Sequence, residues 1–256
     1  MNYIGTAVTD IGISKKTNQD SVCVKIAESE KHGQVAMVVL CDGMGGLAKG
    51  ELASATVIRA FSKWFDDVLP ERLVKFSWKK ITEEWEKLAK EQNYLIAQYG
   101  KKTDVTLGTT LTAMLAVDNK YLILHVGDSR IYKIKNSVDQ MTEDHTFIAR
   151  EIKSGRMTHE EAMKDKRRNM LLQCVGASNT IEPQIVTGKL EKNAIYMFCS
   201  DGFRHVLTKD EMFQRLSPDV LADADSMEQN SKHLIEEVKK RKEKDNITVA
   251  LLRTVS

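Results

Sequence analysis

The hydrophobic pattern of the chain centres on residues 35–41, an unbroken run of seven apolar side chains. A run of this length that is rich in valine is typical of a strand buried on both faces. Asp42 follows directly, and Gly43, Gly45 and Gly46 come after it, so the backbone there can turn sharply and approach a ligand closely. The pattern predicts a central strand with a carboxylate at its end, although Asp-Gly is also a common turn pair.

Shorter apolar runs and helical spacings predict further elements on both sides of this strand. We expect strands at 3–12, 20–27, 107–117, 121–126, 131–135, 181–190, 194–199 and 246–252. We expect helices near 49–66, 77–98, 208–216 and 227–242. No internal repeat and no Pro- or Gly-rich linker breaks the series, so residues 1–256 are expected to form one domain.

Residues 146–168 differ in character, because charged residues and two short helical patterns replace the strands there. Thr158 and Glu161 have the spacing of a capping box at the start of the second short helix. The segment ends in a run of charges from Lys164 to Arg168. This run is either a docking surface for an acidic partner or a solvated face, and the pattern leaves both interpretations open.

The composition excludes several classes of protein. Lys and Arg number 38 against 36 Asp and Glu, whereas a nucleic-acid-binding protein usually has a larger basic excess. No apolar run approaches the roughly 20 residues of a membrane span, and the N-terminus lacks the pattern of a secretion signal. The four cysteines have no CxxC spacing and the six histidines have no zinc-type spacing. We therefore expect a cytoplasmic protein with buried thiols and with no nucleic-acid or membrane partner.

Five aspartates stand next to predicted strands that are far apart in the sequence: Asp20, Asp42, Asp128, Asp201 and Asp245. If these strand ends meet at one edge of a sheet pair, the carboxylates will repel one another unless cations neutralise them. Mg²⁺ and Mn²⁺ prefer oxygen ligands, and two such ions close together suit in-line attack on phosphorus. Spacing alone does not decide between such a site and ordinary turns, in which aspartate is common.

Ordered motifs along nearly the whole chain add a resemblance to a known family. They are Asp10-Ile-Gly12, Asn18-Gln-Asp20, Asp42-Gly-Met-Gly-Gly46, Gly108-Thr-Thr110, Val126-Gly-Asp-Ser-Arg130, Met141-Thr-Glu-Asp-His145, Ser200-Asp-Gly202 and Asp245-Asn-Ile-Thr248. Each motif is weak alone, but the ordered set resembles the PP2C (PPM) metal-dependent protein serine/threonine phosphatases, and their bacterial branch in particular.

The resemblance implies both a fold and an activity. The fold is α+β, a four-layer α-β-β-α sandwich of two antiparallel sheets flanked by helices, with 146–168 as a flap beside the active site. The implied activity is hydrolysis of phosphoserine and phosphothreonine by direct attack of a metal-bound hydroxide, without a phosphoenzyme. The implied partners are phosphorylated proteins, namely the substrates of a bacterial Ser/Thr kinase and the kinase itself, and the enzyme is expected to be a monomer.

The resemblance also assigns a metal site with two ions, Mn²⁺ or Mg²⁺. Asp42 would bridge both ions, and the carbonyl of Gly43 would bind one of them. Asp201 and Asp245 would bind the other, so that Asp42, Asp201 and Asp245 are the expected catalytic residues. Asp20 would orient the waters that the ions hold.

Asp128 matches a family acid that helps to hold a third, weaker ion. Lys15 precedes Asp20 by five residues and stands where the family usually has a phosphate-binding arginine, so Lys15 is the expected substrate-binding cation. The adjacent Lys16 competes for this role, and both lysines could also be merely solvated. Gln19 replaces a glutamate found in some members, which implies that one ion is held by more water.

Two further departures concern the source of a proton. Met44 occupies the position where animal relatives have a histidine thought to act as a general acid, so water or another group would have to supply the proton. Arg204 and His205 are less usual after Asp201-Gly-Phe203. His205 is either a nearby acid or a surface histidine that follows a turn.

Other functions fit part of these observations. A two-metal hydrolase could act on another phosphoester, and activity on phosphopeptides compared with small phosphate esters would separate the two. A pseudophosphatase would use the same fold to bind a partner, but retention of Asp42, Asp201 and Asp245 argues against it. A redox or zinc protein does not fit the cysteine spacing.

Overall fold

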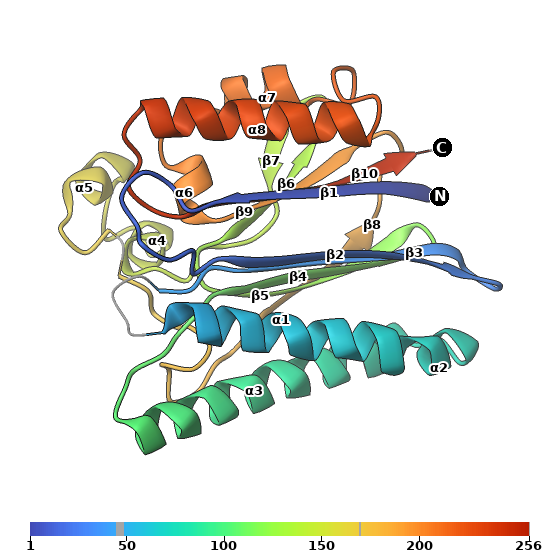
Figure 1. Ribbon diagram of the computed structural model, residues 1–256, viewed down its shortest axis with the longest axis horizontal. Helices are drawn as coiled ribbons and strands as arrows, with labels where there is room; N and C mark the ends of the chain where they lie inside the picture. The colour runs from blue at the N-terminus through green and yellow to red at the C-terminus, as the bar shows by residue number, and fades with distance from the viewer. Residues whose placement is uncertain (45–48, 169, 256) are drawn as a thin grey trace.

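The computed structural model describes residues 1–44, 49–168 and 170–255, so Gly45 and Gly46 of the predicted turn lie outside the described residues. The described chain forms two five-stranded antiparallel sheets packed face to face, with helices on both outer faces (Figure 1). The predicted α+β sandwich with four layers is confirmed. Within the described ranges, no helix has the length and the apolar character needed to cross a membrane.

The ten strands divide equally between the two sheets. The first sheet has the order β1-β10-β9-β6-β7 and consists of β1 (Asn2–Asp10), β6 (Arg130–Ile134), β7 (Val138–Gln140), β9 (Ile195–Cys199) and β10 (Ile247–Val255). The second has the order β2-β3-β4-β5-β8 and consists of β2 (Ser21–Ser29), β3 (Gly33–Cys41), β4 (Leu111–Val117), β5 (Lys120–Val126) and β8 (Gln184–Lys189).

Helices cover both sheets and one end of the sandwich (Figure 1). The second sheet is covered by α1 (Gly50–Asp67) and α3 (Trp78–Thr103), which are joined through α2 (Leu69–Val74). The first sheet is covered by α7 (Lys209–Leu216) and α8 (Ala224–Lys240). The short helices at one end are α4 (Phe147–Lys153), α5 (His159–Lys164) and α6 (Asp201–Arg204). The predicted capping box of Thr158 and Glu161 is present at the start of α5.

The central strand β3 is buried on both faces, as its continuous apolar sequence predicts. Successive side chains of a strand point to opposite faces. The odd-numbered residues from Val35 to Cys41 pack in the cluster that holds Trp85 of α3. The even-numbered residues from Ala36 to Leu40 pack in the layer between the two sheets. This double burial fixes the strand rigidly, and with it the position of the residue that follows it.

Some elements differ from the sequence-based expectation. β1 ends at Asp10 instead of residue 12, because Gly12 has a φ of 75° and a Cβ there would lie 2.3 Å from the carbonyl oxygen of Asp245. α2, α6 and β7 were not expected, since elements of three to six residues show too little periodicity. α3 continues to Thr103, five residues beyond the predicted end.

The strand register brings the important strand ends to one edge of the sandwich. Cys41 at the end of β3 pairs with Ser21 at the start of β2. Cys199 at the end of β9 pairs with Arg130 at the start of β6. Val249, near the start of β10, also pairs with Cys199. The five aspartates lie within a few residues of these strand ends and therefore gather at the same edge.

Candidate metal centre

The backbone of Asp42 is held on both sides by the segment that leads into β4. Its N–H donates to Oγ1 of Thr110 over 2.9 Å. Its carbonyl oxygen accepts from the N–H of Thr110 over 2.9 Å and from the hydroxyl of Thr109 over 3.0 Å. Because the main chain makes these contacts, the carboxylate of Asp42 stays available to a ligand.

Gly43 occupies a place where no larger residue fits. Its N–H donates to the carbonyl of Gln19 over 3.1 Å. A Cβ at this position would lie 2.5 Å from that carbonyl oxygen and 2.6 Å from the carbonyl oxygen of Gly50. Glycine therefore lets three backbone segments meet next to Asp42, which brings bare main-chain atoms to the edge where the acids gather.

Asp201 and Asp245 come from segments that touch through Gly202. Asp201 is the first residue of α6, and Asp245 lies two residues before β10. A Cβ on Gly202 would stand 2.1 Å from the carbonyl oxygen of Asn246, so only glycine allows this approach. The two carboxylates are consequently held close together, and burial followed by the charge of Asp245 raises the pKa of Asp201.

The side-chain amide of Asn246 fastens the loop between β1 and β2 to this pair. Its Nδ2 donates to the carbonyl oxygens of Ile11 and Thr17 over 2.9 and 3.2 Å. Its Oδ1 accepts from the N–H of Gln19 over 2.9 Å. These bonds fix the backbone just before Asp20, so that Asp20 joins the other acids.

Burial and mutual repulsion raise the pKa values of the clustered acids. Burial raises the pKa of Asp20 to about 6, and the charges of Asp201 and Asp245 add to the effect. Burial followed by the charge of Asp201 raises the pKa of Asp128 to about 7. Asp42 has its pKa raised well above the usual range, by burial first and then by Asp20. Buried carboxylates whose negative charges repel one another attract cations strongly.

The donor set fits a hard divalent cation. The available atoms are carboxylate and carbonyl oxygens, the ligands that Mg²⁺ and Mn²⁺ take. Oδ2 of Asp20 is buried and has no hydrogen-bond partner among the described residues. The described part of the chain does not place three acid, histidine or cysteine groups around one point. Nζ of Lys15 lies 2.7 Å from Oδ1 of Asp245 instead, so metal binding would have to release Asp245 from this ion pair.

A hollow of about 640 Å³ opens beside the cluster, and its lining includes Lys15, Asp128, Asp201, His205 and Asp245. This volume is of the size that small-molecule sites have. A larger hollow of about 870 Å³ lies between α3 and residues 176–182, but none of the five aspartates lines it. The smaller hollow is therefore the candidate active site.

The family model described as protein phosphatase 2C matches residues 13–239 of the chain. The chain belongs to the protein phosphatase 2C family. The resemblance drawn from the ordered motifs is thus confirmed, and the protein is an enzyme of the phosphoprotein phosphatase class.

Two curated relatives of this PP2C protein match along nearly the whole chain. The serine/threonine phosphatase stp of Listeria welshimeri is 29% identical over 247 residues, which are 95% of this chain and 93% of the relative. The protein phosphatase PhpP of Streptococcus pneumoniae is 28% identical over 249 residues, which are 96% of this chain and 95% of the relative. Both relatives are bacterial.

Solved structures of PP2C type superpose on the whole fold. The serine/threonine phosphatase of S. agalactiae is similar with a TM-score of 0.84 and 28% identity, and the match covers 100% of both chains. The catalytic domain of the serine/threonine protein phosphatase PstP was solved in complex with two manganese ions. It is similar with a TM-score of 0.77 and 28% identity, and the match covers 99% of both chains.

The residues that depart from the PP2C pattern lie close to the site. Lys15 lines the hollow, whereas Lys16 is exposed outside it. The N–H of Met44 donates to the carbonyl of Gly108, and Met44 is the last described residue before residue 49. His205 is exposed, but its Nε2 lies 3.6 Å from Oδ2 of Asp201. The structure therefore favours the interpretation of His205 as a neighbour of the acids over that of a free surface histidine.

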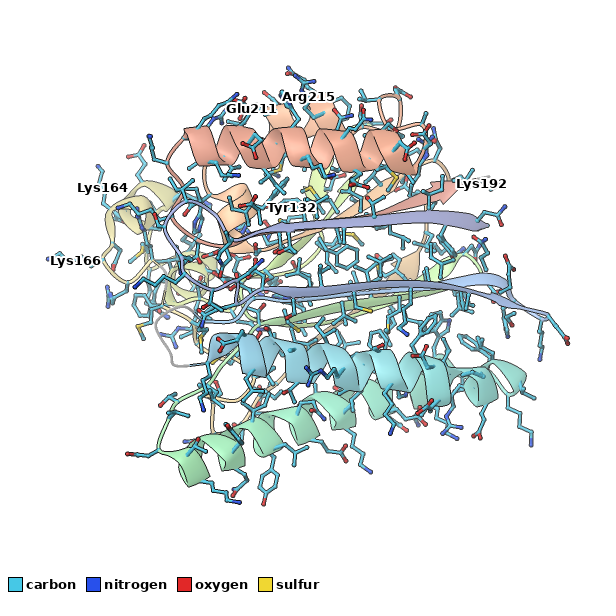
Figure 2. All side chains as sticks on the ribbon, in the orientation of Figure 1. Tyr132, Lys164, Lys166, Lys192, Glu211 and Arg215 are labelled. Atoms are coloured by element: carbon cyan, nitrogen blue, oxygen red, sulfur yellow. The ribbon has the colours of Figure 1, made fainter. Side chains whose placement is uncertain are left out.

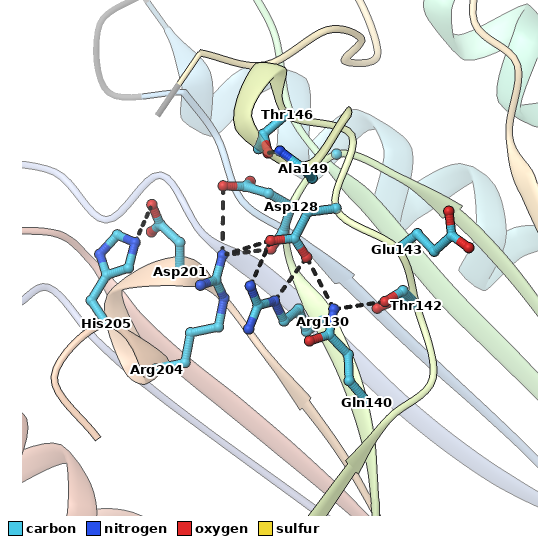
Figure 3. A network of polar contacts seen from close by, with 12 residues as sticks. Asp128, Arg130, Gln140, Thr142, Glu143, Thr146, Ala149, Asp201, Arg204 and His205 are labelled. Atoms are coloured by element: carbon cyan, nitrogen blue, oxygen red, sulfur yellow. Dashed lines mark hydrogen bonds and ion pairs between the residues drawn. The ribbon is translucent and has the colours of Figure 1, made fainter. Parts of the chain in front are cut away.

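Sequence reasoning did not foresee the network that adjoins Asp128 (Figure 3). Arg130 donates two hydrogen bonds to the carboxylate of Asp144, over 2.7 and 2.6 Å. Arg204 approaches the same carboxylate and that of Asp128, at 3.7 Å each. The unusual Arg204-His205 pair after the Ser200-Asp-Gly motif was the one sign of this network in the sequence. It did not reveal the partners of Arg204, Asp128 and Asp144, because they are remote in the sequence.

His125 supports the turn that presents Asp128, and its environment keeps it neutral. Its Nε2 faces the carbonyl oxygens of Gly127 and Glu143 at 3.0 and 3.1 Å, so this nitrogen carries the proton. Its Nδ1 lies 2.9 Å from Oγ1 of Thr112 and accepts from that hydroxyl. Burial, with a smaller contribution from the nearby His145, lowers the pKa of His125 to about 3.

We expect His125 to make the metal-free protein less stable in mild acid. Between the unfolded pKa of roughly 6.5 and the folded value near 3, the unfolded chain binds a proton at this residue and the folded chain does not. The free energy of unfolding should therefore fall with decreasing pH by up to about 1.4 kcal/mol per pH unit from this group. Urea unfolding of the wild type and His125→Gln between pH 4 and 7 would measure it, and equal pH slopes would contradict the assignment.

Proposed function

We propose that this PP2C enzyme is a metal-dependent serine/threonine phosphatase that removes phosphate from phosphoserine and phosphothreonine in proteins. One observation carries the proposal: aspartates from five distant segments gather at one edge of the sandwich, where burial and their neighbours raise the pKa values of Asp20, Asp42, Asp128 and Asp201. A cluster of buried, mutually repelling carboxylates destabilises the folded chain, and it is suited to binding divalent cations.

In this proposal two ions, Mn²⁺ or Mg²⁺, bind in the core of the site. Asp42 would contact both ions, with the carbonyl of Gly43 on one and with Asp201 and Asp245 on the other. Asp20, whose Oδ2 has no partner among the described residues, would orient coordinated water. When bound, the ions would lower the pKa of a coordinated water and so supply the nucleophile that attacks phosphorus, without a phosphoenzyme.

The side chain of Lys15 would bind the substrate phosphate and offset its negative charge. Lys15 pairs with Asp245 and lines the hollow. If Asp245 held an ion, the ammonium group of Lys15 would be free to bind a phosphate oxygen. The leaving alkoxide must receive a proton, and water in the open hollow can donate it, since Met44 offers no acidic group.

We further propose the biological setting that goes with this chemistry. The chain would act as one PP2C domain over residues 1–256, as a monomer, with 146–168 as a flap beside the hollow. Its partners would be phosphorylated proteins, including the substrates of a Ser/Thr kinase and that kinase. The four cysteines are free thiols, which is typical of proteins in a reducing compartment such as the cytoplasm.

The decisive test is phosphate release from a phosphothreonine peptide, measured with and without added Mn²⁺. We expect turnover that depends on the metal and that EDTA abolishes. Faster turnover of small phosphate esters together with inertness toward phosphopeptides would favour the other type of phosphoester hydrolase. Binding of phosphoprotein without turnover at any metal concentration would favour a pseudophosphatase.

The flap at 146–168 leads to a prediction about substrate choice. Of the charged residues from Lys164 to Arg168, the structure leaves one as the candidate for contact with a bound substrate. Lys164 and Lys166 extend outward from the flap (Figure 2). Arg167 is engaged by Asp165, Nη2 to Oδ2 at 2.7 Å, and lies 4.0 Å over the ring of Phe147. Arg168 lines the hollow, so it is the residue of the run that can reach groups beside a bound phosphate.

We therefore expect Arg168→Gln to raise KM for acidic phosphopeptides about two- to fivefold, the effect of an exposed ion pair worth up to about 1 kcal/mol. A small aryl phosphate lacks the flanking acidic groups, so its KM should change little. Lys166→Gln is the matched control and should behave like the wild type. An equal loss on both substrates, or a larger effect of Lys166→Gln, would exclude this docking role.

A further inference from the structure

The closest cation to Asp128 in the described structure is the guanidinium of Arg204 (Figure 3). Nη2 of Arg204 donates to the backbone carbonyl of Asp128 over 3.0 Å and lies 3.7 Å from its Oδ2. The contact joins the end of α6 to the turn after β5, and the two residues are 76 positions apart in the sequence. Arg204 therefore fixes both the position of this turn and the electrostatic surroundings of its carboxylate.

The charges at this corner balance without an added ion. Two carboxylates, Asp128 and Asp144, face two guanidinium groups, Arg130 and Arg204. Arg130 binds Asp144 through two parallel hydrogen bonds, a strong and directional arrangement. Arg204 lies between the two carboxylates, 3.7 Å from each. Elsewhere in the described acid cluster, Lys15 pairs with Asp245 and His205 lies 3.6 Å from Asp201.

Arg204 is a permanent and well-anchored charge. Its side chain is 11% exposed, and its Nε is buried without a hydrogen-bond partner in the described residues. Arginine stays protonated at every pH that a folded protein tolerates. A divalent ion bound by the Asp128 carboxylate would be repelled by this charge, whose Nη2 already lies 3.7 Å from Oδ2 of Asp128.

We propose that the guanidinium of Arg204 takes the place of a metal ion beside the carboxylate of Asp128. The protein then binds two divalent ions around Asp42 and none at Asp128. The inference rests on the proposed two-ion site and replaces the third ion that the family resemblance assigned to Asp128. Arg204 is a positioning residue here, since it holds the turn at Asp128 and neutralises its carboxylate from a neighbouring helix. The two ions around Asp42 would then have the fixed charge of Arg204 near them instead of an exchangeable third ion.

The test counts Mn²⁺ ions bound per chain by equilibrium dialysis with metal analysis, in the full-length protein. We expect two ions in the wild type and in Arg204→Lys, which keeps the charge. Arg204→Gln should gain a third, weaker ion, and Asp128→Asn added to Arg204→Gln should remove it again. Arg215→Gln changes an exposed arginine on α7 and is the matched control, with the wild-type count.

If Arg204→Gln does not fold, the single variant Asp128→Asn still tests whether Asp128 binds an ion. Under the proposal this variant still binds two ions with the wild-type affinities. A third ion in the wild type that Asp128→Asn removes would overturn the inference, and so would a folded Arg204→Gln that binds only two. A wild-type protein that binds no Mn²⁺ would overturn the two-ion function as well, whereas three ions would overturn the role of Arg204 alone.

Discussion

Replacing Asp201 by Asn should lower kcat by about 10²–10³-fold or more, the loss that follows removal of one preorganised electrostatic group at a reacting centre. The amide keeps the shape of the side chain but lacks the charge that holds a divalent ion. Phosphate release from a phosphothreonine peptide in saturating Mn²⁺ would measure the loss. Undiminished turnover in Asp201→Asn, or turnover of the wild type in excess EDTA, would contradict a two-ion mechanism.

The stability of Asp201→Asn separates a lost ligand from a damaged fold. Burial raises the pKa of Asp201, and the charge of Asp245 raises it further, so the ionised carboxylate is unfavourable in the metal-free protein. The variant should therefore unfold at the same temperature as the wild type, or higher, when no metal is present. Added Mn²⁺ should raise the unfolding temperature less in the variant, because a ligand that binds the folded protein more weakly stabilises it less. Asp219→Asn replaces an exposed aspartate and should match the wild type in both measurements.

Replacing Lys15 by Ala should mainly raise KM, by about five- to 150-fold, if a hydrogen bond between its ammonium group and the substrate phosphate is lost. Lys15 lines the hollow and its Nζ is 2.7 Å from Oδ1 of Asp245, so it stands within reach of the site that would hold the phosphate. Steady-state kinetics with an aryl phosphate would give KM and kcat separately. A loss confined to kcat would instead indicate that Lys15 acts by orienting Asp245.

Two companion variants define the role of Lys15. Lys15→Arg should keep activity and tighten substrate binding, because a guanidinium grips two phosphate oxygens where an ammonium offers a single compact charge. Lys16→Ala is the matched control, since Lys16 is exposed and does not line the hollow. If Lys16→Ala raised KM and Lys15→Ala left it unchanged, the assignment of this loop would be off by one residue.

The sequence by itself determined the layered fold and the family. Residues 35–41 are apolar without interruption, which is typical of a strand covered on both faces, and the sandwich as a whole followed from the family resemblance. The order of the short motifs, from Asp10-Ile-Gly12 to Asp245-Asn-Ile-Thr248, identified PP2C before any side chain was placed. Long, strongly periodic elements such as α1 and α3 were also predicted, because their local pattern repeats over many residues.

The tertiary structure decided what surrounds each acid. The family resemblance assigned Asp128 to a third ion, but the cation that lies beside its carboxylate, Arg204, is 76 residues away. The same holds for Lys15, which meets Asp245 only because Asn246 fastens the loop before Asp20 to β10. Hydrophobic periodicity is a local property that a sequence displays directly. The charge balance of a site depends on contacts between remote segments, and these exist only once the sheets have brought their edges together.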